Sequence, residues 1–160
     1  VKKIFLWIFF ALAAAALIGL SVWNSQKGVH LSQDELGKGI TERWNGGLPE
    51  GYAATEARDL DENGFGYLFA KLVYEKDIAK LLEQWESAAD GAGAQFEGIL
   101  EEYLSSSLIT DGNRSTVAAG RPEIGQEWTG FAMDKDDTGA RIVLLYDPQT
   151  TTMYVAEKLV

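Results

Sequence analysis

Apolar residues follow one another without interruption near the start of the chain. The run from Ile4 to Trp23 covers twenty positions and contains no charged residue. As a helix at about 1.5 Å per residue, this run would extend roughly 30 Å, which is the thickness of the hydrocarbon core of a bilayer. The pattern therefore predicts a transmembrane anchor over residues 1–23.

The residues at the two ends of this run set its expected position and direction. Trp7 and Trp23 lie near its ends, where indole rings favour the headgroup region of a bilayer. Lys2 and Lys3 precede it, and basic residues tend to stay on the cytoplasmic side. We therefore expect a single-pass protein of the cell membrane whose C-terminal domain lies outside the cytoplasm. The alternative is a cleaved signal peptide followed by secretion, although the apolar core of such peptides is usually shorter, about 7–15 residues.

Small residues recur every four positions on one face of the predicted transmembrane helix. They are Ala11, Ala15 and Gly19. Small side chains at this spacing let two membrane helices approach each other closely. This face is therefore a candidate for homodimer formation, while an alanine-rich segment also produces such a pattern by chance.

Residues 24–47 predict a polar link followed by a short amphipathic helix. Ser32 and Glu35 have the spacing of a capping box at the start of a helix. Apolar residues then recur every four positions, at Leu36, Ile40 and Trp44. We expect this helix to lie outside the core, which would leave Trp44 exposed as a possible interface residue, because tryptophan is enriched at binding hot spots.

Residues 48–160 predict one exported α+β domain in which helices come first and strands follow. Helical periodicity extends over residues 65–90 and 94–108, with residues 53–60 as a further helical piece. The sequence pattern then changes to short segments rich in β-branched and aromatic residues, separated by turns. These strands are expected over residues 127–133, 140–146 and 153–158, and a further short strand over residues 115–119. Short connections imply antiparallel pairing, so the expected sheet is a three- or four-stranded meander.

The charge of the chain excludes one class of partner. All 24 acidic residues follow residue 30, while Lys2 and Lys3 are the only basic residues before the end of the apolar run. Of the 14 basic residues, 12 therefore remain beyond that run, against 24 acidic ones, a net charge of −12. A surface of this sign repels phosphate backbones, whose binding depends on Lys and Arg. Nucleic acid is not an expected partner.

Cysteine and histidine usage excludes several kinds of chemistry. The chain has no cysteine, so disulfides, thiolate catalysis, Cys-based zinc sites and iron–sulfur clusters are ruled out. His30 is the only histidine and lies in the predicted polar link, away from the expected core. A catalytic triad, which needs its base held near a nucleophile on a rigid element, is not expected there.

One acidic segment resembles the first half of a calcium-binding loop. Asp59, Asp61 and Asn63, followed by Gly64, supply three oxygen-bearing side chains and the glycine of the sharp turn. The second half does not fit, because Ala70 occupies the place of the bidentate glutamate. We therefore weigh a weak Ca²⁺ site against a plain polar turn. No other cofactor is expected.

Acidic pairs are the remaining source of catalytic chemistry. Glu97 and Glu101 lie four residues apart on one predicted helix face, and hydrolases of glycosidase type need only two acids across a cleft. With 24 acidic residues such pairs arise by chance, and a solvated helix face is the plainer interpretation. We therefore do not expect an enzyme.

Three functions follow from these patterns. The leading expectation is a membrane-anchored protein that displays a small acidic α+β domain and binds a protein partner or the cell envelope. The alternatives are a small-molecule carrier with a pocket between helices and sheet, and a hydrolase that uses carboxylates alone. Two facing buried acids would favour the hydrolase, an apolar cavity the carrier, and an exposed aromatic patch the partner-binding module.

Overall fold

The computed structural model describes residues 33–135 and 137–160, which form an antiparallel sheet with helices on both faces. Six strands lie in the order β1-β2-β6-β5-β4-β3, and every neighbouring pair is antiparallel. The elements in chain order are α2 (Gln33–Trp44), β1 (Tyr52–Leu60), β2 (Gly66–Tyr74), the 3-10 turn η1 (Ala79–Leu82), β3 (Glu86–Ser87), the 3-10 turn η2 (Ala88–Asp90), α3 (Ala92–Ser105), α4 (Asp111–Ala119), β4 (Thr129–Lys135), β5 (Ala140–Asp147) and β6 (Thr152–Leu159).

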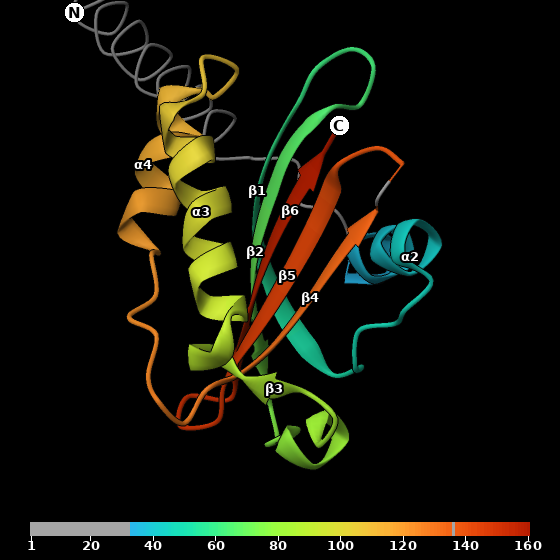
Figure 1. Cartoon of the computed structure of the whole chain (residues 1–160), viewed down its shortest axis with the longest axis vertical. Coiled ribbons are helices and arrows are strands. Elements are labelled where there is room, and N and C mark those ends of the chain that lie inside the picture. Colours follow the sequence, from blue (N-terminus) through green and yellow to red (C-terminus); the bar gives the residue numbers. More distant parts are fainter. Residues whose placement is uncertain (1–32, 136) are drawn as a thin grey trace, which may run out of the picture. The chain divides into compact units, whose positions relative to one another are not determined.

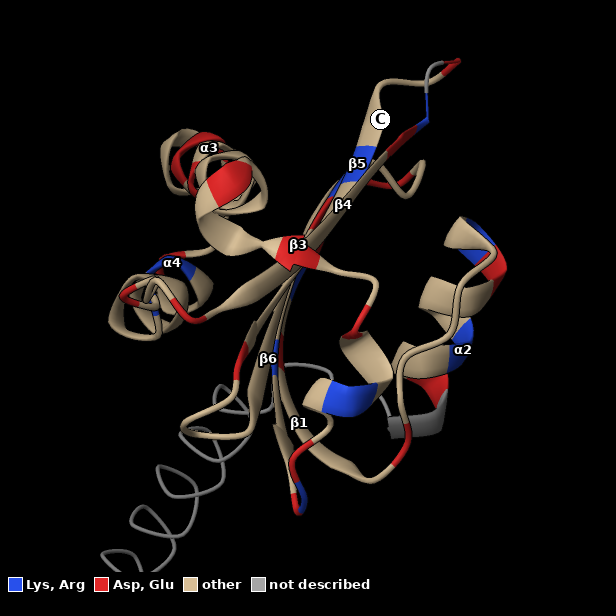
Figure 2. Cartoon of the chain, turned by 60° about the horizontal axis from the view of Figure 1, so that its bottom comes forward, with Lys and Arg blue, Asp and Glu red and all other residues tan. Residues whose placement is uncertain are grey.

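The helices divide between the two faces of the sheet. Helices α3 and α4 cover one face, which we call the helix-pair face, and α2 covers the other, which we call the α2 face (Figures 1 and 2). Each face has its own apolar core, so the central strands β2, β5 and β6 are buried on both sides. This arrangement explains why those strands carry long apolar runs without polar alternation.

Helix α2 is held against the sheet by the stripe that its sequence predicts. Leu36, Ile40 and Trp44 are all buried in the core of the α2 face. The helix is also tied to β6 by polar contacts, because Arg43 and Trp44 both donate hydrogen bonds to the buried carboxylate of Glu157. Residues 33–44 are therefore part of the same compact unit as the sheet, which spans Leu31–Val160.

Helix α3 supplies most of the core on the opposite face. Its buried side chains follow helical spacing and are Phe96, Ile99, Leu100 and Tyr103. Helix α4 is shorter and begins at Thr110, whose side chain accepts a hydrogen bond from the backbone of Asn113 as an N-cap. Val117 is its buried residue and packs into the same core.

The expected order of helices first and strands afterwards is wrong. Residues 52–60 and 66–74, both predicted as helical, form the strands β1 and β2, and residues 115–119, predicted as a strand, lie in α4. The sheet has six strands instead of three or four, and it begins before the helix pair. The three later strands do occur, as β4, β5 and β6, within two residues of their expected starts.

The expected transmembrane segment lies outside the described residues. It comprises residues 1–23, with Lys2 and Lys3, Trp7 and Trp23 at its ends and the small-residue face of Ala11, Ala15 and Gly19. Within residues 33–135 and 137–160, none of the helices combines the length and the apolar character needed to cross a bilayer. The predicted single-pass membrane localisation is therefore not supported by the structure.

Candidate functional site

Strand register builds two adjacent rows of side chains on the helix-pair face. Alternate residues of a strand point to the same face, and residues paired across strands lie side by side. The inner row is apolar and consists of Ala57, Phe69 and Ala156. The outer row, two residues along each strand, is polar and consists of Thr55, Lys71 and Tyr154. An apolar floor therefore ends in a polar rim across β1, β2 and β6.

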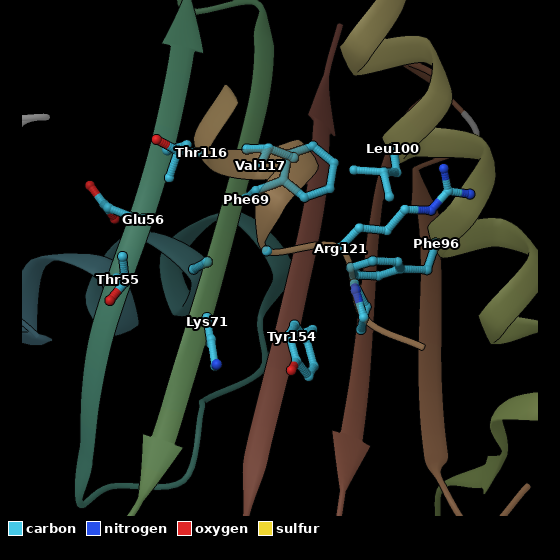
Figure 3. Close-up of a pocket in the computed structure, with 14 residues that line it drawn as sticks. Thr55, Glu56, Phe69, Lys71, Phe96, Leu100, Thr116, Val117, Arg121 and Tyr154 are labelled. Atoms are coloured by element: carbon cyan, nitrogen blue, oxygen red, sulfur yellow. The ribbon is translucent and has the colours of Figure 1, made fainter. Parts of the chain in front are cut away.

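A cavity of about 170 Å³ lies above these two rows. Figure 3 shows the side chains of α3, of α4 and of the segment after α4 arranged over the three strands. The residues that cover the floor are Phe96 and Leu100 from α3, Thr116 and Val117 from α4, and Gly120, Arg121 and Pro122 from the segment that follows. Elements far apart in the sequence thus meet at one pocket.

The inner part of this pocket is apolar and well packed. Phe69 on the sheet and Phe96 on α3 meet edge to face, with ring centroids 6.1 Å apart and an angle of 90° between the rings. Both are buried, as are Leu100 and Val117. Ala57 and Ala156 are the smallest apolar side chains of the row, and their size leaves space that larger residues would fill.

The rim carries one ammonium group between two hydroxyl groups. Neighbouring strands are about 4.8 Å apart, so Lys71 lies next to Thr55 on one side and next to Tyr154 on the other. Lys71 is exposed, and its Nζ lies 5.9 Å from the centroid of the Tyr154 ring. Burial, and then the charge of Asp147, raises the pKa of Tyr154 above its usual value. Its hydroxyl therefore stays protonated at neutral pH and can donate to an anion.

The two cations beside the pocket have different surroundings. Arg121 forms ion pairs with Glu97 and, at 3.7 Å, with Glu101. Its charge is thus compensated by α3. Lys71 takes part in none of the ion pairs found within the described part of the chain. In a protein with a net charge of −10, Lys71 is therefore an exposed ammonium group at the edge of the apolar cavity, whose lining also includes the acidic residue Glu56 of β1.

The aromatic ring of Tyr154 is fixed in place by a neighbour. Trp128 stacks on it with ring centroids 5.4 Å apart and an angle of 11°. Trp128 is buried, so it braces the Tyr154 side chain from the side away from solvent. Preorganised groups of this kind reduce the entropy lost when a ligand is bound.

Buried acids do not form a catalytic pair in the described part of the chain. Asp59 lies on the helix-pair face and accepts hydrogen bonds from Tyr103 and Asn113, whereas Glu157 lies on the α2 face. Asp147 pairs with Thr152, which pairs with Val73, which in turn pairs with Ala53. Asp147 is therefore level with Ala53, which precedes Asp59 in β1 by six residues. At about 3.3 Å per residue, that places Asp147 and Asp59 roughly 20 Å apart along the strands. The arrangement that would favour a carboxylate hydrolase is not found among these residues.

The segment that resembles a calcium loop is the turn between β1 and β2. Asp59 is the second-last residue of β1, and its side chain points into the core, toward Tyr103. Asp61 accepts hydrogen bonds from the backbone of Asn63 and Phe65, as a turn-forming aspartate does. No group of three or more His, Asp or Glu side chains among the described residues is placed to hold a metal ion. The Ca²⁺ hypothesis therefore rests on the sequence pattern alone.

Trp44 does not form the exposed patch that we expected. Only 4% of it is exposed, because α2 packs on the sheet instead of lying outside the core, and its indole N–H donates to Glu157 at 2.5 Å. Trp128 is also buried and Trp85 is half-buried. The most exposed large apolar residues are Leu81 in η1, Leu108 between α3 and α4, and the neighbours Val160 and Phe65, which lie next to the paired residues Leu159 and Gly66 at one end of the sheet. His30 lies outside the described residues.

None of the rim residues was singled out from the sequence. Lys71 interrupts an apolar run, and this is the signal that could have found it, because a lone cation within a buried strand needs a reason. Because residues 65–90 were predicted to be helical, the residues that lie beside Lys71 in the sheet could not be found. Pairing with Thr55 and Tyr154 depends on strands that are 16 and 83 residues away in the chain.

Comparison with known proteins finds no match to this chain among protein-family models, curated proteins or solved structures.

Proposed function

We propose that this domain binds a small carboxylate that carries an apolar body, and that it acts as a carrier or sensor of such a molecule. The observation that supports the proposal is the adjacency of two rows, Ala57–Phe69–Ala156 and Thr55–Lys71–Tyr154, under one cavity. The apolar row and the helix residues above it would bury the body of the ligand. The ammonium and the two hydroxyl groups would hold its carboxylate.

The size of the cavity limits the ligand. An apolar cavity of about 150 Å³ is known to accept benzene, so a cavity of about 170 Å³ suits one ring or a short acyl chain. An arylacetate such as phenylacetate fits both the apolar part and the rim. Longer fatty acids would extend out of the cavity.

The charge of the protein favours a single anionic group over a strongly charged ligand. Lys71 takes part in none of the ion pairs among the described residues, while Glu97 and Glu101 pair with Arg121 and Glu56 adds a further acid to the lining. One carboxylate matches one ammonium. A phosphate ester would bring a second negative charge into an acidic protein without a second free cation to receive it.

The test compares phenylacetate with phenylacetamide, which has the same shape and no charge, by isothermal titration of the full-length protein. We expect a Kd below about 1 mM for the acid and at least tenfold weaker binding of the amide, since a charge-assisted hydrogen bond contributes roughly 1.5–3 kcal/mol. Equal affinity for the two compounds, or no heat of binding for either, would overturn the proposal.

Variants of the rim locate the binding. Lys71→Gln and Tyr154→Phe are expected to weaken phenylacetate binding about five- to tenfold each, and to weaken phenylacetamide binding much less, because hydrogen bonds to a neutral amide oxygen contribute less than those to a carboxylate. Lys80→Gln is the matched control, because Lys80 is an exposed lysine in η1, away from the pocket. If Lys80→Gln weakened binding as much as Lys71→Gln, the acid would be attracted by general charge and not by the rim.

Partner binding has weaker support than small-molecule binding. The expected exposed tryptophan is not present among residues 33–135 and 137–160, and the exposed apolar neighbours that register shows there are the pair Phe65 and Val160. Single apolar residues scattered on a surface are normal in proteins that bind nothing there.

A further inference from the structure

A second cavity, of about 180 Å³, lies on the α2 face of the sheet, opposite the pocket beneath α3 and α4. It is lined by the C-terminal half of α2, the segment after it, Trp85, and strands β4 and β5. The lining residues are Ile40, Trp44, Gly46, Gly47, Leu48, Trp85, Phe131, Met133, Ile142 and Leu144. Since the sheet separates the two cavities, a ligand in one does not occupy the other.

Aromatic rings form two walls of this cavity. Trp85 and Phe131 stack on each other, with ring centroids 5.8 Å apart and an angle of 28°. Trp44 forms the wall on the side of α2, and the ammonium of Lys135 lies 5.1 Å from the centroid of its ring. Met133 adds a thioether at the rim, and sulfur makes favourable contacts with aromatic rings. These walls suit a flat aromatic guest.

The cavity offers nothing to a charged guest. No charged side chain is among its lining residues. The nearest acid, Glu157, is fully buried and already accepts hydrogen bonds from Arg43 and from the indole N–H of Trp44. A cationic guest on Trp44 would be repelled by the ammonium of Lys135. An anionic guest inside the cavity would lose its hydration against apolar walls, because Lys135 is not among the lining residues.

The segment after α2 leaves one side of the cavity without side chains. Gly46 and Gly47 lie there in succession. A Cβ atom built on Gly46 would come no closer than 3.9 Å to another atom, and one on Gly47 no closer than 3.8 Å. The fold therefore does not need glycine at these positions for steric reasons, and their small size keeps the cavity accessible from the α2 side.

We propose that this cavity binds a neutral planar aromatic compound of one or two rings, of which indole is the model. The binding is separate from that of the carboxylate beneath the helix pair, so the two proposals stand or fall independently. A volume of about 180 Å³ exceeds that of the apolar cavity that accepts benzene, and it leaves room for a second fused ring.

The test follows the backbone amides of Gly46 and Gly47 by ¹H–¹⁵N NMR of the full-length protein while indole is added. We expect saturable shifts of both amides with a Kd below about 1 mM. Cyclohexanol, which is similar in apolar character but not aromatic, is expected to bind at least tenfold more weakly. Glycine amides that do not move at several millimolar indole would identify the cavity as a packing defect. Equal affinity for cyclohexanol would overturn the aromatic class.

Two substitutions reduce the cavity from different sides. Leu144→Phe enlarges a buried wall residue in β5, and Met133→Trp enlarges a partly exposed rim residue in β4. The Met133 variant is expected to fold even if the larger side chain at the buried position 144 prevents folding. Each substitution is expected to raise the Kd for indole at least tenfold. Leu81→Phe is the matched control, because Leu81 is exposed in η1 and lines neither cavity. An unchanged Kd in folded Leu144→Phe and Met133→Trp would overturn the proposal.

The same titration separates this site from the proposed carboxylate site. Phenylacetate is expected to leave the amides of Gly46 and Gly47 in place, and Lys71→Gln is expected to leave indole binding unchanged. Loss of indole binding in Lys71→Gln would show that indole binds beneath the helix pair, which would contradict the assignment to the α2 face and leave the carboxylate proposal standing.

Discussion

Arg43 and Glu157 form a two-pronged ion pair, in which Nε donates to Oε1 and Nη2 donates to Oε2, each at 2.7 Å. The two residues are 114 positions apart in the chain. The Glu157 side chain is completely buried, and the neighbouring indole of Trp44 donates to the same carboxylate. A carboxylate buried in this way depends on its partners, because an unpaired buried charge is strongly unfavourable.

Arg43→Met is expected to lower the free energy of unfolding by about 3 kcal/mol, since it removes two of the three donors to a buried carboxylate. Urea denaturation measures this change. The double variant Arg43→Met/Glu157→Leu is expected to recover much of the loss, because it removes the charge that was left unpaired. Lys38→Met is the control on the same helix. Its ion pair with Glu42 is exposed on both sides, so a change within about 0.5 kcal/mol is expected.

Tyr103→Phe is expected to destabilise the domain by about 2 kcal/mol. The Tyr103 hydroxyl donates to the buried carboxylate of Asp59 at 2.6 Å, and hydrogen bonds to charged groups contribute roughly 1.5–3 kcal/mol. Tyr67→Phe is the comparison. The two rings touch edge to face, but the Tyr67 hydroxyl lies 3.5 Å from an exposed Glu102. If both variants lost the same stability in thermal denaturation, the Asp59 hydrogen bond would not be the cause.

Gly66→Ala is expected to be among the most damaging single changes in the β1–β2 hairpin, with a loss of roughly 3 kcal/mol or more. Gly66 has a φ of +143°, and a Cβ atom built on it would lie 2.1 Å from the carbonyl oxygen of Asp59. Gly64, the glycine of the suspected calcium loop, has a φ of +81° but no neighbour within 4 Å. Gly64→Ala is therefore expected to cost only about 1 kcal/mol, as measured by chemical denaturation.

Stability is expected to fall as the pH rises above about 10. Burial raises the pKa of five tyrosines, which are Tyr67, Tyr74, Tyr103, Tyr146 and Tyr154. The folded state then keeps protons that the unfolded state releases, so their contribution is complete below pH 10 and is lost at higher pH. Tyrosinate absorbance should rise together with the loss of far-ultraviolet circular dichroism. Absorbance that rises while the dichroism stays native would contradict these raised pKa values.

The sequence predicts those elements that bury a single face or lie between clear turns. Helix α2 buries the stripe of Leu36, Ile40 and Trp44, and α3 buries Phe96, Ile99 and Leu100 at helical spacing. Strands β4, β5 and β6 follow one another through short turns, and turn residues mark their ends. Local patterns suffice for these five elements.

Strand β2 shows where local patterns fail. Phe65, Leu68, Phe69 and Leu72 fit one stripe of a helix, but Leu68 and Leu72 point to the α2 face and Phe69 to the helix-pair face. A strand covered by helices on both sides needs apolar residues at consecutive positions, so it loses the alternation by which strands are recognised. The aromatic content of the run was the better guide.

The candidate site could not be predicted once β1 and β2 were taken as helices. Its rim depends on the register of Thr55 with Lys71 and of Lys71 with Tyr154. Register is a property of the assembled sheet, because each residue is beside another only after both strands have formed. The exposure predicted for Trp44 failed for a similar reason, since Glu157, its hydrogen-bond partner, comes 113 residues later.

Strand β6 lies between two hairpins that do not touch each other within the sheet. β1 and β2 form one hairpin, β4 and β5 form the other, and only β6 pairs with both of them. The turn from β5 to β6 is also short, so β4, β5 and β6 can form early as one meander, whereas pairing β6 with β2 joins residues far apart in the chain. The late step of folding is therefore expected to be the pairing of β6 with the β1–β2 hairpin. A nascent chain that lacks residues 152–159 would hold two open sheet edges, the feature that leads unfinished β proteins to aggregate.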